Sequence, residues 1–114
     1  PDYLSVFSKK VLEKIRQTPI RISENQVIYK TCSLGYVEMP LFMNNPGLFN
    51  LQQMINLSDY AMYRAKENGR NCAARFKLVQ QEGKGEEIKN YLLNLSRCDK
   101  INEEYFSIEF VCEC

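Results

Sequence analysis

The spacing of apolar residues predicts a helix over residues 3–17. Leu4, Phe7, Val11 and Ile15 recur every three or four positions, which is the spacing of one face of a helix. We therefore expect these four residues to form the buried stripe. The charged residues between them are then available for the solvent side: Lys9, Lys10, Glu13 and Arg16.

A β-hairpin is predicted next, from two segments rich in Ile, Val, Tyr and Thr on either side of a polar turn. The short strand covers residues 19–23, the turn 24–26, and the long strand 27–37. The long strand lacks clean alternation after Lys30, which is typical of a strand buried on much of both faces. Gly35 within it indicates either a bulge or the close approach of another backbone.

A second helix is predicted after a loop over residues 39–50, which is rich in Pro, Gly and Asn. The helix begins at Leu51 and ends at Asn68-Gly69, a common stop signal at the C-terminus of a helix. Its apolar positions lie on one stripe, which we expect to be buried: Met54, Leu57, Ala61 and Ala65.

The remaining sequence predicts a strand over 72–79, a polar loop over 80–85, a helix over 86–96 and a strand over 105–114. The resulting order predicts an α/β or α+β fold with helices covering a sheet. In the last helix we expect Ile88, Leu92 and Leu95 to point inward, with Glu86 and Glu87 at its positive end. Alternation in the last strand places these residues on one face: Phe106, Ile108, Phe110, Cys112 and Cys114.

Composition narrows the functional classes. The chain has 114 residues, 45% of them hydrophobic, and a net charge of +1, as expected for one globular domain rather than a disordered chain. The near-neutral charge argues against a nucleic-acid or membrane-surface binder, and no apolar run reaches the ~20 residues of a spanning helix. The absence of histidine excludes a Ser-His-Asp triad and a His-containing zinc site within this chain.

The five cysteines are an odd number without a CxxC pair, which predicts neither a disulfide framework nor a zinc site. We expect Cys112 and Cys114 to be small core residues, and the compartment to be reducing and cytoplasmic. No carboxylate cluster suited to a metal is apparent, so four carboxylates are interpreted as solvated charges: Glu86, Glu87, Glu103 and Glu104.

The densest polar cluster covers residues 59–71. Lys66 and Arg70 are four residues apart near a helix end, where both can project to one side and bind a polyanion such as a triphosphate. The alternative is that cations in the last helical turn are stabilised by the macrodipole alone. Tyr60 and Tyr63 are predicted to pack rather than to stack on bases.

Residues 57–71 resemble the C-terminal signature of GGDEF domains, the diguanylate cyclases, whose pattern is A-D-x-A-L-Y-x-A-K-x-x-G-R-N. Residues 31–36 are similar to the T-x-S-I-G-x strand of that family, and residues 11–16 to its A-E-R-I-R helix. The resemblance covers about residues 3–79. The positions that match the longest motif are Asp59, Ala61, Tyr63, Ala65, Lys66, Gly69, Arg70 and Asn71.

The resemblance implies a palm-like fold in a bacterial signalling enzyme that condenses two GTP into cyclic di-GMP across a dimer, with two Mg²⁺ ions. Carried over by position, Lys66 and Arg70 contact the GTP phosphates. Asp59 is implied to be a cap or a helix-positioning residue without a catalytic role. The other motif positions are implied to be structural: Tyr63, Ala65, Gly69 and Asn71.

The chain departs from the family because it lacks the GG[DE]EF hairpin, the metal-binding Asp and the guanine-contacting residues. We therefore expect residues 1–79 to be the C-terminal half of a GGDEF domain whose sheet lacks its N-terminal strands. Residues 80–114 are an unassigned tail that completes the sheet or docks on a partner chain. This chain alone would hold no catalytic residue and no metal, so Mg²⁺ is expected only for the complete domain.

Two other functions remain open. One is a catalytically inactive GGDEF remnant that binds a nucleotide or a protein partner. The other, disfavoured by the balanced charge, is a nucleic-acid binder that uses Arg64, Lys66, Arg70, Arg75 and Lys77. We also expect self-association, through an exposed sheet edge and an uncovered helix face.

Overall fold

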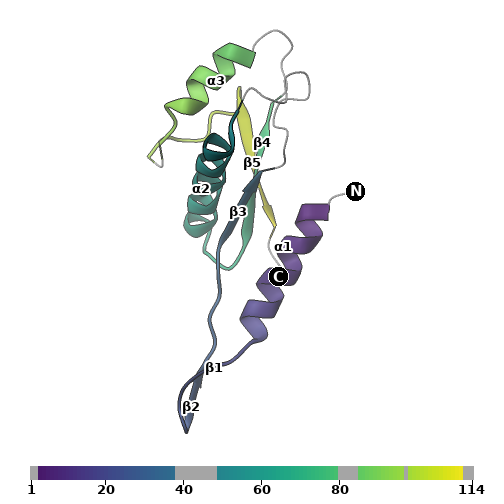
Figure 1. The fold of residues 1–114 in the computed structure, drawn as a ribbon, viewed down its shortest axis with the longest axis vertical. Helices are drawn as coiled ribbons and strands as arrows, with labels where there is room; N and C mark the ends of the chain where they lie inside the picture. Colours follow the sequence, from purple (N-terminus) through teal and green to yellow (C-terminus); the bar gives the residue numbers. More distant parts are fainter. Residues whose placement is uncertain (1–2, 38–48, 80–84, 97, 112–114) are drawn as a thin grey trace.

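A computed structural model describes residues 3–37, 49–79, 85–96 and 98–111 of the chain. It is a mixed α+β fold, as the sequence predicts, with two small sheets (Figure 1). The elements, in chain order, are α1 (Tyr3–Gln17), β1 (Ile20–Ser23), β2 (Gln26–Ile28), β3 (Leu34–Val37), α2 (Leu51–Glu67), β4 (Ala73–Leu78), α3 (Gly85–Leu93) and β5 (Phe106–Val111).

The larger sheet has the strand order β3-β4-β5. β3 is parallel to β4, and α2 is the helical crossover that a parallel pair requires. β5 is antiparallel to β4 and pairs with all of it, from Ala73 opposite Val111 to Leu78 opposite Phe106. The C-terminal segment therefore completes this sheet, which is one of the two roles expected for residues 80–114.

The core lies between this sheet and the helices α2 and α3. The rings of Phe76 and Phe106 stack with centroids 4.7 Å apart, and Tyr60 meets Phe106 edge-on at 5.6 Å. The predicted stripe of α2 is buried, and Ile88 and Leu92 of α3 complete the core. Aromatic pairs in these geometries add to the stability that their buried area provides.

The predicted long strand over residues 27–37 is wrong. The segment forms two short strands, and residues 29–33 between them are not in a strand. β2 pairs with β1 whereas β3 pairs with β4, so the two strands belong to separate sheets and the segment between them crosses from one sheet to the other (Figure 1). All four residues of β3 are only half-buried, because this strand lies at a sheet edge.

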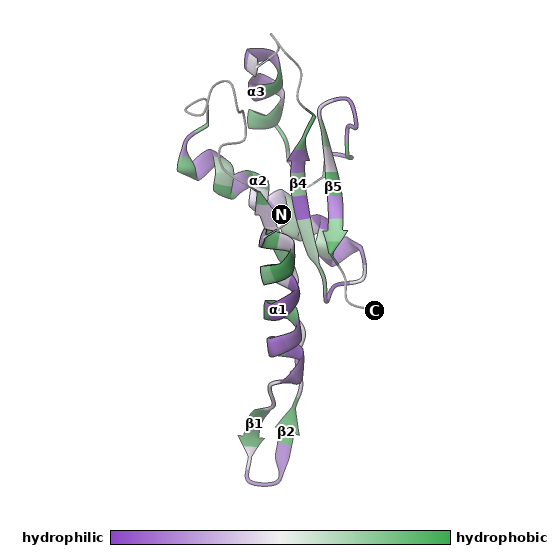
Figure 2. Ribbon diagram, turned by 90° about the vertical axis from the view of Figure 1, so that its right-hand side faces the viewer, coloured by the Kyte–Doolittle hydropathy of each residue, from purple (hydrophilic) through white to green (hydrophobic). Residues whose placement is uncertain are grey.

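The predicted buried stripe of α1 is also wrong in part. Phe7 is 56% exposed and Ile15 is 37% exposed, whereas Ser8 and Leu12 are buried. Viewed from two directions, α1 lies on the opposite side of the larger sheet from α2 and contacts only one end of β4 and β5 (Figures 1 and 2). Because α1 contacts the sheet over such a small area, it buries a short row of residues four positions apart and not the whole of its predicted apolar stripe.

In β5, Phe106 is buried as expected, but Phe110 is 41% exposed, because the core that the sheet forms with α2 and α3 includes Phe106 and not Phe110. Cys112 and Cys114 lie outside the described residues, as do most of the loops predicted over 39–50 and 80–85. The hairpin β1–β2 stands apart from the core, and nearly all of its residues are exposed. The molecule is consequently elongated, with a Cα radius of gyration of 16.4 Å.

Candidate phosphate-binding loop

The helix α2 is defined at both ends by its own sequence. Asn50 and Gln53 form a capping box, in which the backbone N–H of each donates to the other side chain at 2.8 Å. At the other end, the Asn68 N–H donates to the Arg64 carbonyl at 2.9 Å. The helix ends at Glu67, close to the predicted stop.

The loop that follows α2 contains three successive residues in the left-handed region. Gly69 has a φ of 99°, Arg70 of 64° and Asn71 of 53°. Gly and Asn tolerate this backbone region, whereas a residue with a long side chain, such as Arg70, rarely adopts it. The Arg70 N–H donates to the Ala65 carbonyl at 3.1 Å and holds the reversed chain against the helix end.

This geometry corrects the expected placement of Arg70. Lys66 lies in the last turn of α2, but Arg70 lies beyond the helix, so the two side chains are not related by helical i,i+4 spacing. Both residues are exposed. The helix end together with residues 68–71 is hereafter the 66–71 loop.

A third cation reaches the 66–71 loop from a distant part of the chain. Arg16, in the last turn of α1, donates from Nη1 to Oδ1 of Asn71 at 3.3 Å, across 55 positions of sequence. The spacing of α1 predicts Arg16 on the solvent side, but the residue is half-buried. Nothing in the local pattern of α1 marks this contact, because it depends on where the helix end meets the loop.

Other cations of the motif region are bound to carboxylates. Arg64 pairs with Glu67, and its guanidinium lies 4.7 Å from the ring centroid of Tyr60 and 5.2 Å from that of Tyr63. On β4, Arg75 and Lys77 lie 3.9 Å and 3.2 Å from carboxylate oxygens of Glu109. Three of the five cations considered for nucleic-acid binding therefore form ion pairs with carboxylates of the chain itself.

The two other segments of the resemblance meet α2 and its loop. Gly35 in β3 lies directly against the backbone of α2: a Cβ at this position would be 2.1 Å from the Ser58 carbonyl oxygen and 2.3 Å from the Met62 nitrogen. Of the two interpretations of Gly35, the close approach is confirmed. The segments 31–36 and 57–71 are therefore packed together, and Arg16 attaches the first segment, 11–16, to the same loop.

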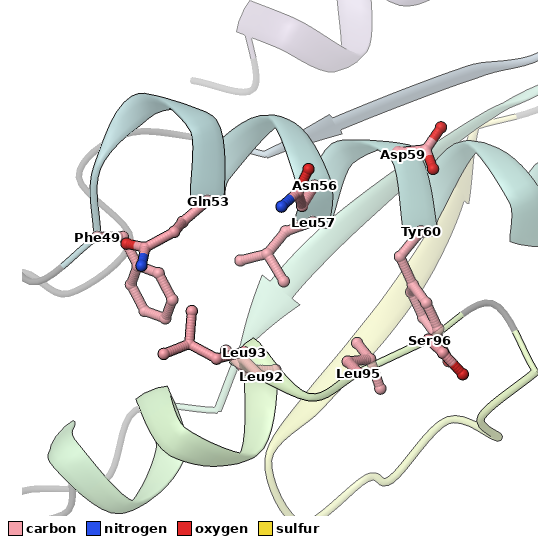
Figure 3. A pocket seen from close by; sticks show the side chains of 10 residues that line it. All are labelled: Phe49, Gln53, Asn56, Leu57, Asp59, Tyr60, Leu92, Leu93, Leu95 and Ser96. Carbon is pink, nitrogen blue, oxygen red and sulfur yellow. The ribbon is translucent and has the colours of Figure 1, made fainter.

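Asp59 lies in the middle of α2 and is half-buried, so it is not a cap; Asn50 has that role. It lies at the rim of a cavity of about 240 Å³ between α2 and the segment that includes α3 (Figure 3). Neither Lys66 nor Arg70 lines this cavity. Its lining residues are Phe49, Gln53, Asn56, Leu57, Asp59, Tyr60, Leu92, Leu93, Leu95 and Ser96.

Tyr60 is buried in the core as predicted, and its hydroxyl donates to the Asp99 carbonyl at 2.8 Å. Burial raises the pKa of Tyr60 above its usual value, although the neighbouring Arg64 lowers it in part. Tyr63 is half-buried and lies beside Arg64. Neither tyrosine forms an exposed stacking platform.

Among the described residues, no three Cys, Asp or Glu side chains come together as a metal site. None of the helices in the described ranges is long and apolar enough to cross a membrane. Comparisons with protein-family models, with curated proteins and with solved structures find no match to this chain.

Proposed function

We propose that the 66–71 loop contacts the phosphates of a guanine nucleotide, as part of a GGDEF-type diguanylate cyclase unit. The observation that carries the proposal is the form of the loop: Lys66 and Arg70 are both exposed at one helix end, on a backbone with three left-handed residues. Two of these three residues, Gly69 and Asn71, are of the types that tolerate a left-handed backbone best.

The chemistry of the two side chains fits a triphosphate. A guanidinium can bind two phosphate oxygens in a fork, and an ammonium acts as a point charge beside them. In phosphoryl transfer, fixed cations offset the charge that develops on the phosphate oxygens. The role proposed for Lys66 and Arg70 is therefore binding and charge neutralisation, and the carboxylates and Mg²⁺ of such a reaction belong to the complete domain.

A second candidate function is an interaction module without catalysis. The observation that favours it is the amount of apolar surface left exposed on α1 and on the hairpin, including Tyr3, Phe7 and Ile22. A binding module can retain the 66–71 loop for nucleotide recognition without the other groups of a cyclase.

The proposal is tested by calorimetric titration of the chain with Mg²⁺-GTP and, separately, with guanosine. We expect GTP to bind and guanosine to bind far more weakly, because the loop contacts phosphates. Lys66→Gln and Arg70→Gln should each weaken GTP binding about tenfold or more, the usual effect of losing a charged hydrogen bond. Lys100→Gln, at another exposed lysine, is the matched control.

Equal affinity of the wild-type chain and both variants would refute the proposed role of the loop, as would no GTP binding at millimolar concentration. We expect no cyclic di-GMP when the chain alone is incubated with GTP and Mg²⁺. Its formation would show that this chain contains catalytic groups that the proposal assigns elsewhere.

A further inference from the structure

The contact between Arg16 and Asn71 joins the 66–71 loop to α1. The loop connects α2, on one side of the larger sheet, to β4 within the sheet, whereas α1 lies on the other side of the sheet (Figures 1 and 2). Nη1 of Arg16 donates to Oδ1 of Asn71 at 3.3 Å, and both residues are half-buried. Arg16 therefore holds the loop from a helix that takes no part in forming it.

The loop is anchored at both ends by backbone hydrogen bonds. The Arg70 N–H donates to the Ala65 carbonyl at 3.1 Å, and the Leu34 N–H of β3 donates to the Cys72 carbonyl at 3.0 Å. Arg70 is exposed, whereas Cys72 is fully buried. Asn71 is thus the residue at which the exposed turn meets the buried chain that leads into β4.

The backbone between these anchors has a conformation that needs support. Arg70 has a φ of 64° and Asn71 of 53°, and consecutive left-handed residues other than glycine are rare. Such conformations persist only where the surrounding structure determines them, and they cluster at functional sites. The guanidinium of Arg16, which is bound to the side chain of Asn71, is a part of the surroundings that can supply this support.

We propose that Arg16 is a positioning residue of the 66–71 loop, which through Asn71 maintains the left-handed backbone that presents Arg70 at the same helix end as Lys66. The inference rests on the proposed function, in which this loop contacts the phosphates of a nucleotide. It adds a coupling between distant parts of the chain. Binding of a nucleotide to the ordered loop favours the contact of Arg16 with Asn71, and the contact favours binding to the same extent. The position of α1 is therefore linked to the occupancy of the loop.

The alternative role for Arg16 is direct contact with the phosphates. The hydrogen bond to a neutral amide leaves the positive charge of the guanidinium in place. The geometry favours positioning, because the guanidinium is directed to Asn71 and the residue is half-buried, whereas Lys66 and Arg70 are exposed. A double-mutant cycle distinguishes the two roles, because only a positioning role depends on the side chain of Asn71.

The first test requires no nucleotide. Amide exchange of the full chain, measured by NMR, reports how often the loop opens, because the Arg70 N–H is protected by its hydrogen bond to Ala65. An exposed loop opens locally, so this rate does not depend on the stability of the whole chain. Arg16→Ala should increase the exchange rate of the Arg70 amide about fivefold. Arg21→Ala, which removes an exposed arginine from the hairpin, is the matched control and should leave the rate unchanged.

The second test is the affinity of the same variants for Mg²⁺-GTP. Arg16→Ala should weaken binding about fivefold. Asn71→Gly removes the acceptor but suits a left-handed backbone, so it should have a similar effect. The double variant should bind no more weakly than either single variant, because both substitutions remove the same hydrogen bond. Additive losses would show that Arg16 acts without Asn71, and they would overturn the positioning role.

The coupling has its own measurement. In the wild-type chain, Mg²⁺-GTP should slow amide exchange in the last turn of α1, which contains Arg16. The nucleotide should have no such effect in Asn71→Gly, because the link between the loop and α1 is absent. Equal slowing in both proteins would contradict the coupling through Asn71.

The two tests separate the positioning role from the proposed function. If the wild-type chain does not bind GTP, the proposed function fails, and the exchange rate of the Arg70 amide still decides whether Arg16 positions the loop. If Arg16→Ala changes neither the exchange rate nor the affinity, the positioning role is wrong and GTP binding by the loop stands. Arg16→Lys retains the charge and a donor, so it should be intermediate in both measurements, and circular dichroism checks that each variant is folded.

Discussion

At the scale of single residues, two glycines have different physical reasons for their positions. Gly35 allows β3 and α2 to approach until there is no room for a side chain, whereas Gly69 has nothing within 4 Å of the place where a Cβ would stand. Gly69 is instead required by its φ of 99°. The same residue type therefore serves packing at one position and backbone conformation at the other.

Gly35→Ala should destabilise the chain far more than Gly69→Ala. The added methyl of the first variant meets backbone atoms of Ser58 and Met62, which cannot move without displacing α2, and we expect a loss of about 3 kcal/mol or more. The second variant strains only its own backbone, at a cost of about 1 kcal/mol. Urea denaturation measures both, and equal losses would contradict the close approach of β3 and α2.

At the scale of elements, Tyr60 attaches α2 to the segment between α3 and β5. Its ring lies edge-on to Phe76 and Phe106, and its hydroxyl donates to the carbonyl of Asp99, 39 residues away. The buried phenol has a raised pKa, so the folded chain keeps this proton at a pH where the unfolded chain releases it. The attachment of the two elements therefore depends on pH.

This dependence predicts loss of stability in alkali. Below the ordinary tyrosine pKa of about 10, the phenol is neutral in both states and its contribution is complete. As the pH rises above that value, the unfolded state binds fewer protons than the folded state, so the free energy of unfolding falls. Tyr60→Phe should be less stable at neutral pH, because it loses the hydrogen bond to Asp99, and should lose less stability between pH 9 and 11.

Thermal melts across that pH range measure the effect. Tyr105, whose pKa is also raised, remains in both proteins and accounts for part of the slope. Tyr63→Phe, at the other tyrosine beside Arg64, is the control for the removal of a hydroxyl group from α2. A Tyr60→Phe slope identical to that of the wild type would contradict the role of the buried phenol.

At the scale of the whole molecule, the chain has a packed body and a projecting arm, which comprises α1 and the hairpin β1–β2. The radius of gyration of 16.4 Å exceeds the value of about 13 Å for a compact chain of this length. The extents of 60 × 31 × 25 Å reflect the hairpin, which projects beyond the sheet (Figure 1). The body contains the core, whereas the arm is attached through Ser8, Leu12 and the contact of Arg16.

Hydrogen exchange of the chain should reveal this division between the body and the arm. Amides of β4 should exchange only through global unfolding, because the strand is central in its sheet and most of its residues are buried. Amides of β1 and β2 should exchange with almost no protection. Equal protection of the hairpin and β4 would contradict the exposed position of the hairpin.

Much of the fold could be predicted because it depends on neighbours along the chain. The span of α1, the buried stripe of α2 and the inward positions of Ile88 and Leu92 follow from helical spacing, and Asn68-Gly69 marks the end of α2. The predicted span of α3 is too long: the helix ends at Leu93, so Leu95 packs on the core from the segment after it. The capping box likewise joins two residues only three positions apart, Asn50 and Gln53. The motif locates the candidate loop, and the stop at Asn68-Gly69 places Arg70 after the helix, but local spacing does not show the left-handed backbone of Arg70 and Asn71.

Local patterns are sufficient to locate the three helices and the motif that contains Lys66 and Arg70, because helical spacing, turn residues and caps act over a few positions. Tertiary contacts, in contrast, divide residues 27–37 between two sheets, bury Ser8 and Leu12 of α1 rather than Phe7, and bring Arg16 to Asn71. These outcomes depend on which surfaces meet after the chain has folded, and no local pattern encodes that.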